Sequence, residues 1–220
     1  MKSYLRLILI LLAFCGLITS NGCGGGGSST NGPVIACDIN SFTPNYVMSF
    51  SVFPTWSTFP VHVYFIQDSN FTAHRQIVAQ NGFDLWNTAT SGKINYVVVN
   101  NQSAADITVQ FDPTTQDGLT QVSYNSLSMS TTPMTLGVKN QLDSDLKAIA
   151  AHEFAHALGE IGHSPNPGDL MYSIHFIGTS AQITTNDLNT METGYCHLFG
   201  RNCCARTIPT TGPRIVVPIH

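Results

Sequence analysis

Apolar and polar residues alternate in several short runs between residues 55 and 140, a pattern typical of half-buried strands. The alternation is clearest at Val61, Val63 and Phe65, whose side chains we expect to face a core. Similar runs predict further strands at 94–99, 107–111, 121–124 and 134–138.

A helical period follows the first strand, over residues 71–86. There, Ala73, Ile77, Val78 and Leu85 fall on one stripe, which predicts an amphipathic helix with this stripe facing inward. Gly82 lies within the segment and weakens its helix propensity.

Two more helices are predicted in the second half of the chain. One begins near Asp143 or Ser144, either of which can cap it. Its core face holds Leu146, Ile149, Ala150 and Leu158. The last helix, in TTNDLNTMETGYCHLF, is expected to be capped by Thr185 or Asn186 and to bury Leu188 and Met191.

The stretch HEFAHALGEIGHSPNPGDLMY, residues 152–172, carries the candidate chemistry. His152 and His156 stand four residues apart, so a helix places both imidazoles on one face, where they can bind a single zinc ion. Glu153 can reach a water at the metal. Gly159 offers a turn, after which His163 can return as a third ligand and leave one position open for catalysis.

Glu160 is the alternative third ligand, because it lies four residues after His156. Three ligands in line on one helix converge poorly on a tetrahedral ion, which favours His163. The alternative without a metal site is that the whole stretch is an ordinary amphipathic helix with histidines on its polar side.

The motif resembles that of the metzincin metallopeptidases, and within them the matrixin-like branch. HEFAHALG, then GHS, then NPGDLMY look like the matrixin zinc motif and Met-turn, with Met171 eight residues after His163. The family pattern HExxHxxGxxH would place the third histidine at position 162, but Gly162 stands there and His163 comes one residue late. The extra residue falls in irregular backbone, which absorbs insertions easily.

This resemblance covers roughly residues 55–200 and implies an α+β fold of the zincin and metzincin type. Such a domain has a twisted, mostly parallel sheet with an antiparallel edge strand over an active-site helix, and a small C-terminal subdomain with a Met-turn and a final helix. The resemblance makes the segment around 121–124, or the SMSTTP stretch after it, the candidate edge strand. It also implies a wall of the substrate pocket at Tyr172, His175 and Phe176.

The function implied is that of a zinc endopeptidase, in which metal-activated water attacks a peptide bond and Glu153 acts as the general base. The alternative is a non-catalytic surface binding or adhesion lipoprotein on a metzincin scaffold. Glu153 favours the peptidase, because a binding module needs no base at that position. A latent form in which Cys37 or Asp38 occupies the metal is a further hypothesis.

The composition indicates which classes of molecule we expect the protein to bind. The chain has 43% hydrophobic and 10% charged residues and a net charge of −4, with no basic patch, so we expect no nucleic-acid partner. We expect a peptide or protein substrate and a monomer. A structural Ca²⁺ ion has no supporting loop motif.

The first residues read as an export signal, with Lys2 and Arg6 before the apolar run LILILLAF. Cys23 then opens a glycine- and serine-rich tether and is the candidate lipid attachment site, with simple secretion as the alternative. We therefore expect a signal peptide at 1–22, a tether and strap at 23–54, a catalytic domain at 55–200 and a tail at 201–220. The protein is then exported, either as a cell-envelope lipoprotein or as a secreted protein.

Six cysteines are present, of which Cys15 lies in the expected signal and Cys23 is consumed if it is lipidated. An even number in an oxidising compartment predicts two disulfides among the remaining four, which are Cys37, Cys196, Cys203 and Cys204. We expect Cys37 to join the N-terminal strap to the C-terminal cluster. A cysteine-based zinc site is the weaker alternative, since no CxxC pair is present.

Overall fold

The computed structural model describes residues 34–37, 53–125, 128–174, 178, 180–199, 203–206 and 214–219. The segments expected to form the export signal and the tether lie outside the described residues. No helix in the described ranges is both long enough and apolar enough to cross a membrane.

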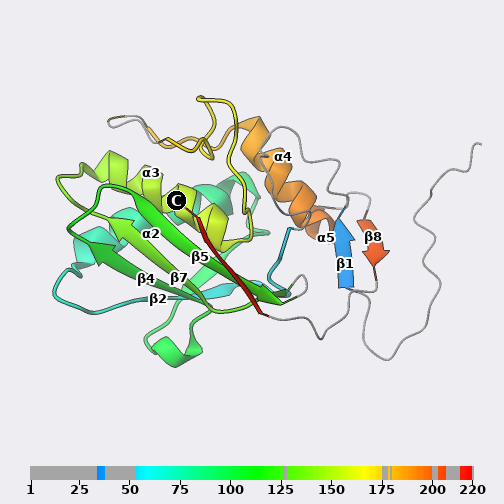
Figure 1. Ribbon diagram of the computed structural model, residues 1–220, viewed down its shortest axis with the longest axis horizontal. Coiled ribbons are helices and arrows are strands. Elements are labelled where there is room, and N and C mark those ends of the chain that lie inside the picture. Colours follow the sequence, from blue (N-terminus) through cyan, green and yellow to red (C-terminus); the bar gives the residue numbers. More distant parts are fainter. Residues whose placement is uncertain are drawn as a thin grey trace, which may run out of the picture. The chain divides into compact units, whose positions relative to one another are not determined.

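A mixed sheet forms one layer of the domain (Figure 1). Its strands run in the order β3-β2-β4-β7-β5-β6, and β9 pairs with β5. The parallel pairs are β2 with β3, β2 with β4, and β4 with β7, whereas β5 is antiparallel to β6, β7 and β9. The strands are β2 (Val61–Phe65), β3 (Tyr96–Val98), β4 (Ile107–Asp112), β5 (Gly118–Asn125), β6 (Ser128–Met129), β7 (Thr132–Gly137) and β9 (Ile215–Ile219).

The expected α+β fold, with mostly parallel strands and an antiparallel edge, is confirmed. A separate two-stranded sheet pairs β1 (Val34–Cys37) with β8 (Cys203–Arg206) in antiparallel orientation.

Helices α2 (Ala73–Ala89) and α3 (Asp143–Ala157) cover one face of the mixed sheet (Figure 1). Helix α4 (Thr185–Gly194) and the short α5 (Cys196–Phe199) lie to one side of that sheet, and a 3₁₀ turn, η2, spans Gln102–Ala104. Helices α2 and α3 pack directly on each other. Trp86 Nε1 donates a hydrogen bond to the carbonyl of Ala151 at 2.8 Å, and the rings of Phe83 and Phe154 stack with centroids 4.4 Å apart.

The core follows the predicted alternation in the strands. Val61, Val63 and Phe65 of β2 are each at most 1% exposed, while His62 between them is exposed. In β4, Ile107, Val109 and Phe111 are fully buried. These side chains fill the space between the sheet and the two long helices.

The predicted inner stripe of α2 is partly wrong. Ala73 is exposed and Ile77 is 57% exposed, because the helix buries Phe83, Trp86 and the residues aligned with them. Gly82 is part of that buried face: a Cβ there would lie 2.5 Å from the carbonyl oxygen of Lys147. The glycine therefore sets the close approach of the two helices rather than merely weakening one of them.

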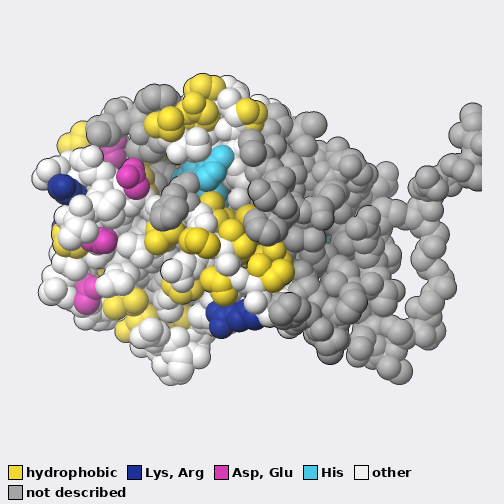
Figure 2. Space-filling view, in the orientation of Figure 1, with side chains coloured by type: hydrophobic (Ala, Val, Ile, Leu, Met, Phe, Trp, Pro, Cys, Tyr) yellow, Lys and Arg dark blue, Asp and Glu magenta, His cyan; other side chains and the backbone are white. Residues whose placement is uncertain are grey.

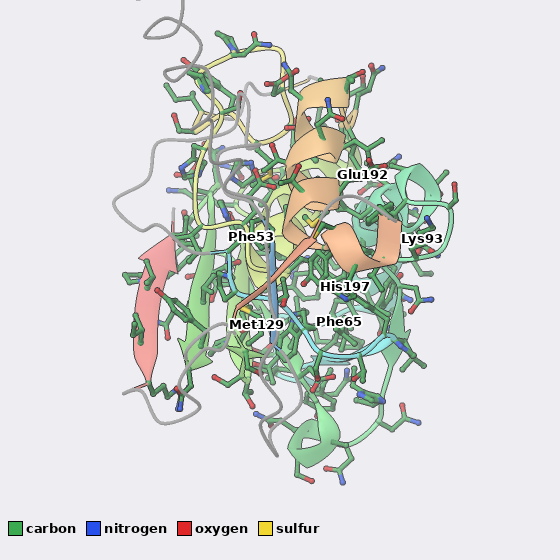
Figure 3. The ribbon with its side chains drawn as sticks, turned by 90° about the vertical axis from the view of Figure 1, so that its right-hand side faces the viewer. Phe53, Phe65, Lys93, Met129, Glu192 and His197 are labelled. Carbon is green, nitrogen blue, oxygen red and sulfur yellow. The ribbon has the colours of Figure 1, made fainter. Side chains whose placement is uncertain are left out.

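The predicted helix caps also need correction. Helix α3 begins at Asp143, and its N-cap is Leu142, which makes no side-chain capping bond. Helix α4 is capped by Thr184, one residue before the predicted position, and Asp187 completes a reciprocal capping box with it. Figure 3 views the domain from the side of α4 and α5.

Candidate metal centre and active-site cleft

Three histidine side chains converge at the C-terminal half of α3. His152 and His156 come from successive turns of the helix, and His163 comes from the loop that follows. The Nε2 atom of His156 lies 3.0 Å from Nε2 of His152 and 3.2 Å from Nε2 of His163. Among the described residues, these three form the group of side chains placed to hold a metal ion.

Backbone carbonyls fix the orientation of two of these rings. Nδ1 of His152 lies 2.8 Å from the carbonyl oxygen of Leu170, and Nδ1 of His156 lies 2.5 Å from that of Glu160. Carbonyl oxygens only accept, so each Nδ1 carries the proton and each Nε2 presents a lone pair. Lone pairs facing one another at about 3 Å repel unless a cation lies between them, which is what a zinc-binding triad requires.

Burial reinforces this protonation state. His156 is fully buried, and its pKa is held well below the usual range by burial and then by the neighbouring His152 and His163. Burial also lowers the pKa of His163. Both rings are therefore neutral near pH 7, the form in which imidazole binds a metal.

The turn after α3 brings His163 back to the helix. Gly159 adopts φ +103°, and a Cβ there would lie 1.8 Å from the carbonyl oxygen of Pro54, so this position requires glycine. The added residue in the motif is absorbed here. Glu160 supplies its backbone carbonyl to His156, while its buried side chain is not a member of the histidine group.

Glu153 lies beside the three histidines with its carboxyl group buried. It is 2% exposed, and the hydroxyl of Thr120 on β5 donates to its Oε2 at 2.6 Å. Burial raises the pKa of Glu153 to about 8 in the metal-free protein, partly offset by the Thr120 hydrogen bond and increased slightly by nearby Asp117. A Cβ at Gly118 would lie 2.3 Å from the Glu153 side chain, so β5 packs directly against this carboxyl group.

A cleft of about 500 Å³ opens at this position. In Figure 2, histidine side chains reach the surface with hydrophobic side chains beside them. The cleft is lined by the end of β4 and the start of β5, by Thr135 of β7, by helix α3, and by the segment after Met171. The lining residues include Asp112, Asp117, Gly118, Leu119, Ile149, His152, Glu153, Tyr172, Ser173 and Ile174.

The loop from His163 to Met171 is closed by its own hydrogen bonds. The amide of Ser164 donates to the carbonyl of Met171 at 2.7 Å, and its hydroxyl donates to Asp169 Oδ2 at 2.5 Å. Asp169 is 6% exposed and also accepts from the hydroxyl of Thr184 at 2.6 Å, which joins the loop to the start of α4. Met171 itself is fully buried.

Asp187 connects the same loop to α4. Its fully buried carboxylate accepts from the backbone amides of Leu170 at 2.9 Å and Met171 at 3.2 Å, and from Thr184 at the helix cap. The carbonyl of Leu170 in turn accepts from His152. Asp187, which completes the capping box of α4, is therefore joined to His152 on α3 through the peptide unit between Leu170 and Met171.

The structure thus brings His152, Glu153, His156 and His163 together, and it places Tyr172 in the cleft wall. His175 and Phe176, predicted to extend that wall, lie outside the described residues, as does Cys23. Sequence reasoning missed Thr120, Asp169 and Asp187. Only Asp187 had a readable signal, the Thr-x-x-Asp spacing of a capping box.

These features define a zinc metallopeptidase: a helix-borne histidine pair, a third histidine from the following turn, and a buried glutamate at a cleft beside a sheet edge. Comparison with protein families agrees, because the Matrixin family model matches residues 55–196. The chain belongs to the matrixin family of zinc endopeptidases, and His152, His156 and His163 hold its catalytic zinc. No curated protein matches the chain in a sequence search.

Proposed function

We propose that this matrixin is an exported endopeptidase in which Glu153 is the general base and the start of β5 binds the substrate backbone. The observation that carries the proposal is the position of the Glu153 carboxyl group. It lines the cleft beside His152 and is buried against Gly118 and Thr120. A surface-binding module has no use for a carboxyl group buried at that cost.

Glu153 is suited to moving a proton within the cleft. A zinc ion held by the three histidines makes water a stronger acid and polarises the carbonyl of the peptide bond. Glu153 accepts the proton of the attacking water and delivers it to the leaving nitrogen. The Thr120 hydroxyl donates to Glu153 Oε2 and so holds the carboxyl group in one orientation beside Gly118. The positive charge of the metal favours ionised Glu153, against the effect of burial.

The substrate is expected to lie along β5. Gly118 and Leu119 line the cleft and belong to the strand that continues through Asn125. An extended peptide can pair with such a strand through main-chain hydrogen bonds, which hold it without requiring a particular side chain. We expect Tyr172 to contact a substrate side chain, because it lines the same cleft. Met171, which is fully buried just before Tyr172, is the proposed Met-turn residue.

Export and lipid attachment at Cys23 remain part of the proposal, supported by the charged start, the apolar run and the glycine-rich tether. Two disulfides among Cys37, Cys196, Cys203 and Cys204 are also proposed. Buried Cys196 is disulfide-bonded, and the register of β1 with β8 sets Cys37 opposite Cys203, which supports them.

The test is digestion of a diverse peptide mixture by zinc-loaded protein, with cut sites read by mass spectrometry. The same preparation of Glu153→Ala, matched for zinc content, is the control. Cleavage by the first protein alone supports the proposal. Equal zinc in both with cleavage in neither would point to a latent enzyme or to the binding-protein alternative.

A further inference from the structure

The outer edge of β5 is already occupied by another segment of the same chain. Strand β5 pairs with β7 through Gly118–Thr120 and with β6 through Tyr124 and Asn125. On its other edge it pairs antiparallel with β9, from Thr120 opposite Ile219 to Tyr124 opposite Ile215. Figures 1 and 3 both show β9 beside β5 at the border of the sheet.

The direction of β9 brings its end to the active site. Its last register partner, Thr120, is the residue whose hydroxyl binds the Glu153 carboxyl group. The next residues of β5 toward its start, Leu119 and Gly118, line the cleft. A strand running as β9 does therefore arrives beside Glu153 and His152, along the path that an extended substrate would take.

Strand β9 has the character of a bound peptide. It buries one face only: Ile219 is 5% exposed and Val217 packs on the core, whereas Val216 on the other face is 50% exposed. Pro218 lies within it and has no amide hydrogen to donate, which restricts it to an edge strand. Arg214, just before the strand, donates to the hydroxyl of Ser123 at 3.1 Å and anchors its start.

We propose that β9 is an intramolecular, substrate-like strand that blocks the binding edge of β5 and keeps the peptidase autoinhibited until it is displaced. The occupant is residues 215–219, and the site it covers is the edge at 120–124. Because β9 runs antiparallel to β5 and ends beside the cleft, it takes the place of substrate residues on the N-terminal side of the bond to be cut. This proposal rests on the proposed function of β5 as the substrate edge.

If β9 blocks the edge of β5, the protein should bind substrate more weakly than it would with β9 released. The apparent dissociation constant of a substrate is its intrinsic value divided by the fraction of molecules with β9 displaced. If that fraction is about one in ten or less, releasing β9 strengthens binding by about tenfold or more.

The first experiment locks β9 in place. Gln121 and Pro218 are register partners whose side chains are both exposed, so a disulfide between Gln121→Cys and Pro218→Cys would cross-link the strands without entering the core. The readout is binding of unfolded, fluorescein-labelled casein to zinc-loaded protein that also carries Glu153→Gln, followed by anisotropy. Pro218→Cys alone and the chain without added cysteines, in oxidant and reductant, set the baselines.

The second experiment loosens β9 with a matched pair of charges. Val217→Asp places a carboxylate on the inner face, where burial disfavours it, and Val216→Asp places the same group on the exposed face. Unfolding by urea, measured alongside, verifies that each variant is folded under the binding conditions.

The proposal predicts at least about a tenfold loss of casein binding when the double-cysteine protein is oxidised, with recovery on reduction. It predicts about tenfold tighter binding to Val217→Asp and little change for Val216→Asp. Binding that is equal in the locked and reduced states would overturn it, as would weaker binding to folded Val217→Asp. Because the readout is binding, this inference is tested separately from catalysis. If β9 is released in zinc-loaded Val217→Asp and this variant still cleaves no peptide, that result counts against the proposed catalytic function alone.

Discussion

Asp187 should govern zinc affinity although it does not touch the metal. The amide of Met171 and the carbonyl of Leu170 belong to one planar peptide unit. Asp187 Oδ1 accepts from that amide at 3.2 Å, and the carbonyl accepts from His152 Nδ1 at 2.8 Å. The carboxylate therefore sets the plane that orients the imidazole of His152.

The magnitude follows from the bonds that each substitution removes. In Asp187→Asn, the remaining carbonyl oxygen can take over the Oδ2 bonds to Leu170 and Thr184, but the new amide faces the N–H of Met171 as donor against donor. Loss of one hydrogen bond to a charged group then costs about 2 kcal/mol of unfolding free energy. Asp187→Ala loses every one of these bonds in a buried place and should cost about 4 kcal/mol.

Two measurements separate stability from orientation. Urea unfolding in the presence of a chelator gives the stability of the metal-free protein. Competition with a chromophoric chelator, at urea concentrations well below those that unfold the protein, gives its zinc affinity. Disturbed support of a zinc-binding histidine weakens affinity by about 10- to 100-fold. Asp143→Asn is the control, since this exposed first-turn carboxylate pairs with exposed His74 and should matter little. Zinc affinity unchanged in a destabilised Asp187→Asn would refute the orienting role.

Four further predictions follow from individual contacts. Thr120→Val removes the hydroxyl at Glu153 and should lower kcat/KM by about tenfold, given about 1–2 kcal/mol for a hydrogen bond to a charged group, while Thr120→Ser should retain activity. In the metal-free protein, folded Glu153 keeps its proton to about pH 8 while the unfolded chain releases it near 4.5, so stability should fall as pH rises between these values. Urea titrations at several pH values should show that Glu153→Gln reduces this fall; an unchanged slope would contradict the assignment. Gly82→Ala should cost about 1–3 kcal/mol in urea unfolding, because its Cβ meets backbone atoms of α3, whereas Ala at the exposed neighbour Asn81 should not destabilise. Removing zinc with a chelator should lower the Tm, and adding zinc should restore it, because zinc binds the folded state in preference to the unfolded chain. A Tm that does not depend on zinc would contradict this preference.

The strands and the histidine group were predictable because their signals are local. Alternation at Val61, Val63 and Phe65 set the inward face of β2, and the spacing of His152 and His156 set one face of α3. The extra residue between Gly159 and His163 was absorbed by the turn at Gly159, whose positive φ no side chain tolerates easily. That is why the late third histidine still reaches its partners.

Other features depend on partners far away in the sequence. The prediction for the inner face of α2 was wrong, because this face is determined by contact with α3 through Gly82 and Trp86 and not by the stripe of aliphatic residues. Thr120 gains its role only when β5 meets Glu153 across 33 positions. Strand β9 lies in a Pro- and Thr-rich tail for which no element was predicted, and its register with β5 has no local signal.

The central claim is that zinc held by His152, His156 and His163 works with Glu153 to hydrolyse peptide bonds. The most direct measurement determines zinc content and peptide cleavage together in one set of preparations: the unaltered chain, Glu153→Gln and His163→Ala. We predict one zinc with cleavage for the first, one zinc without cleavage for the second, and weakened zinc binding without cleavage for the third. Cleavage by Glu153→Gln at the unaltered rate, or full zinc affinity in His163→Ala, would contradict the account.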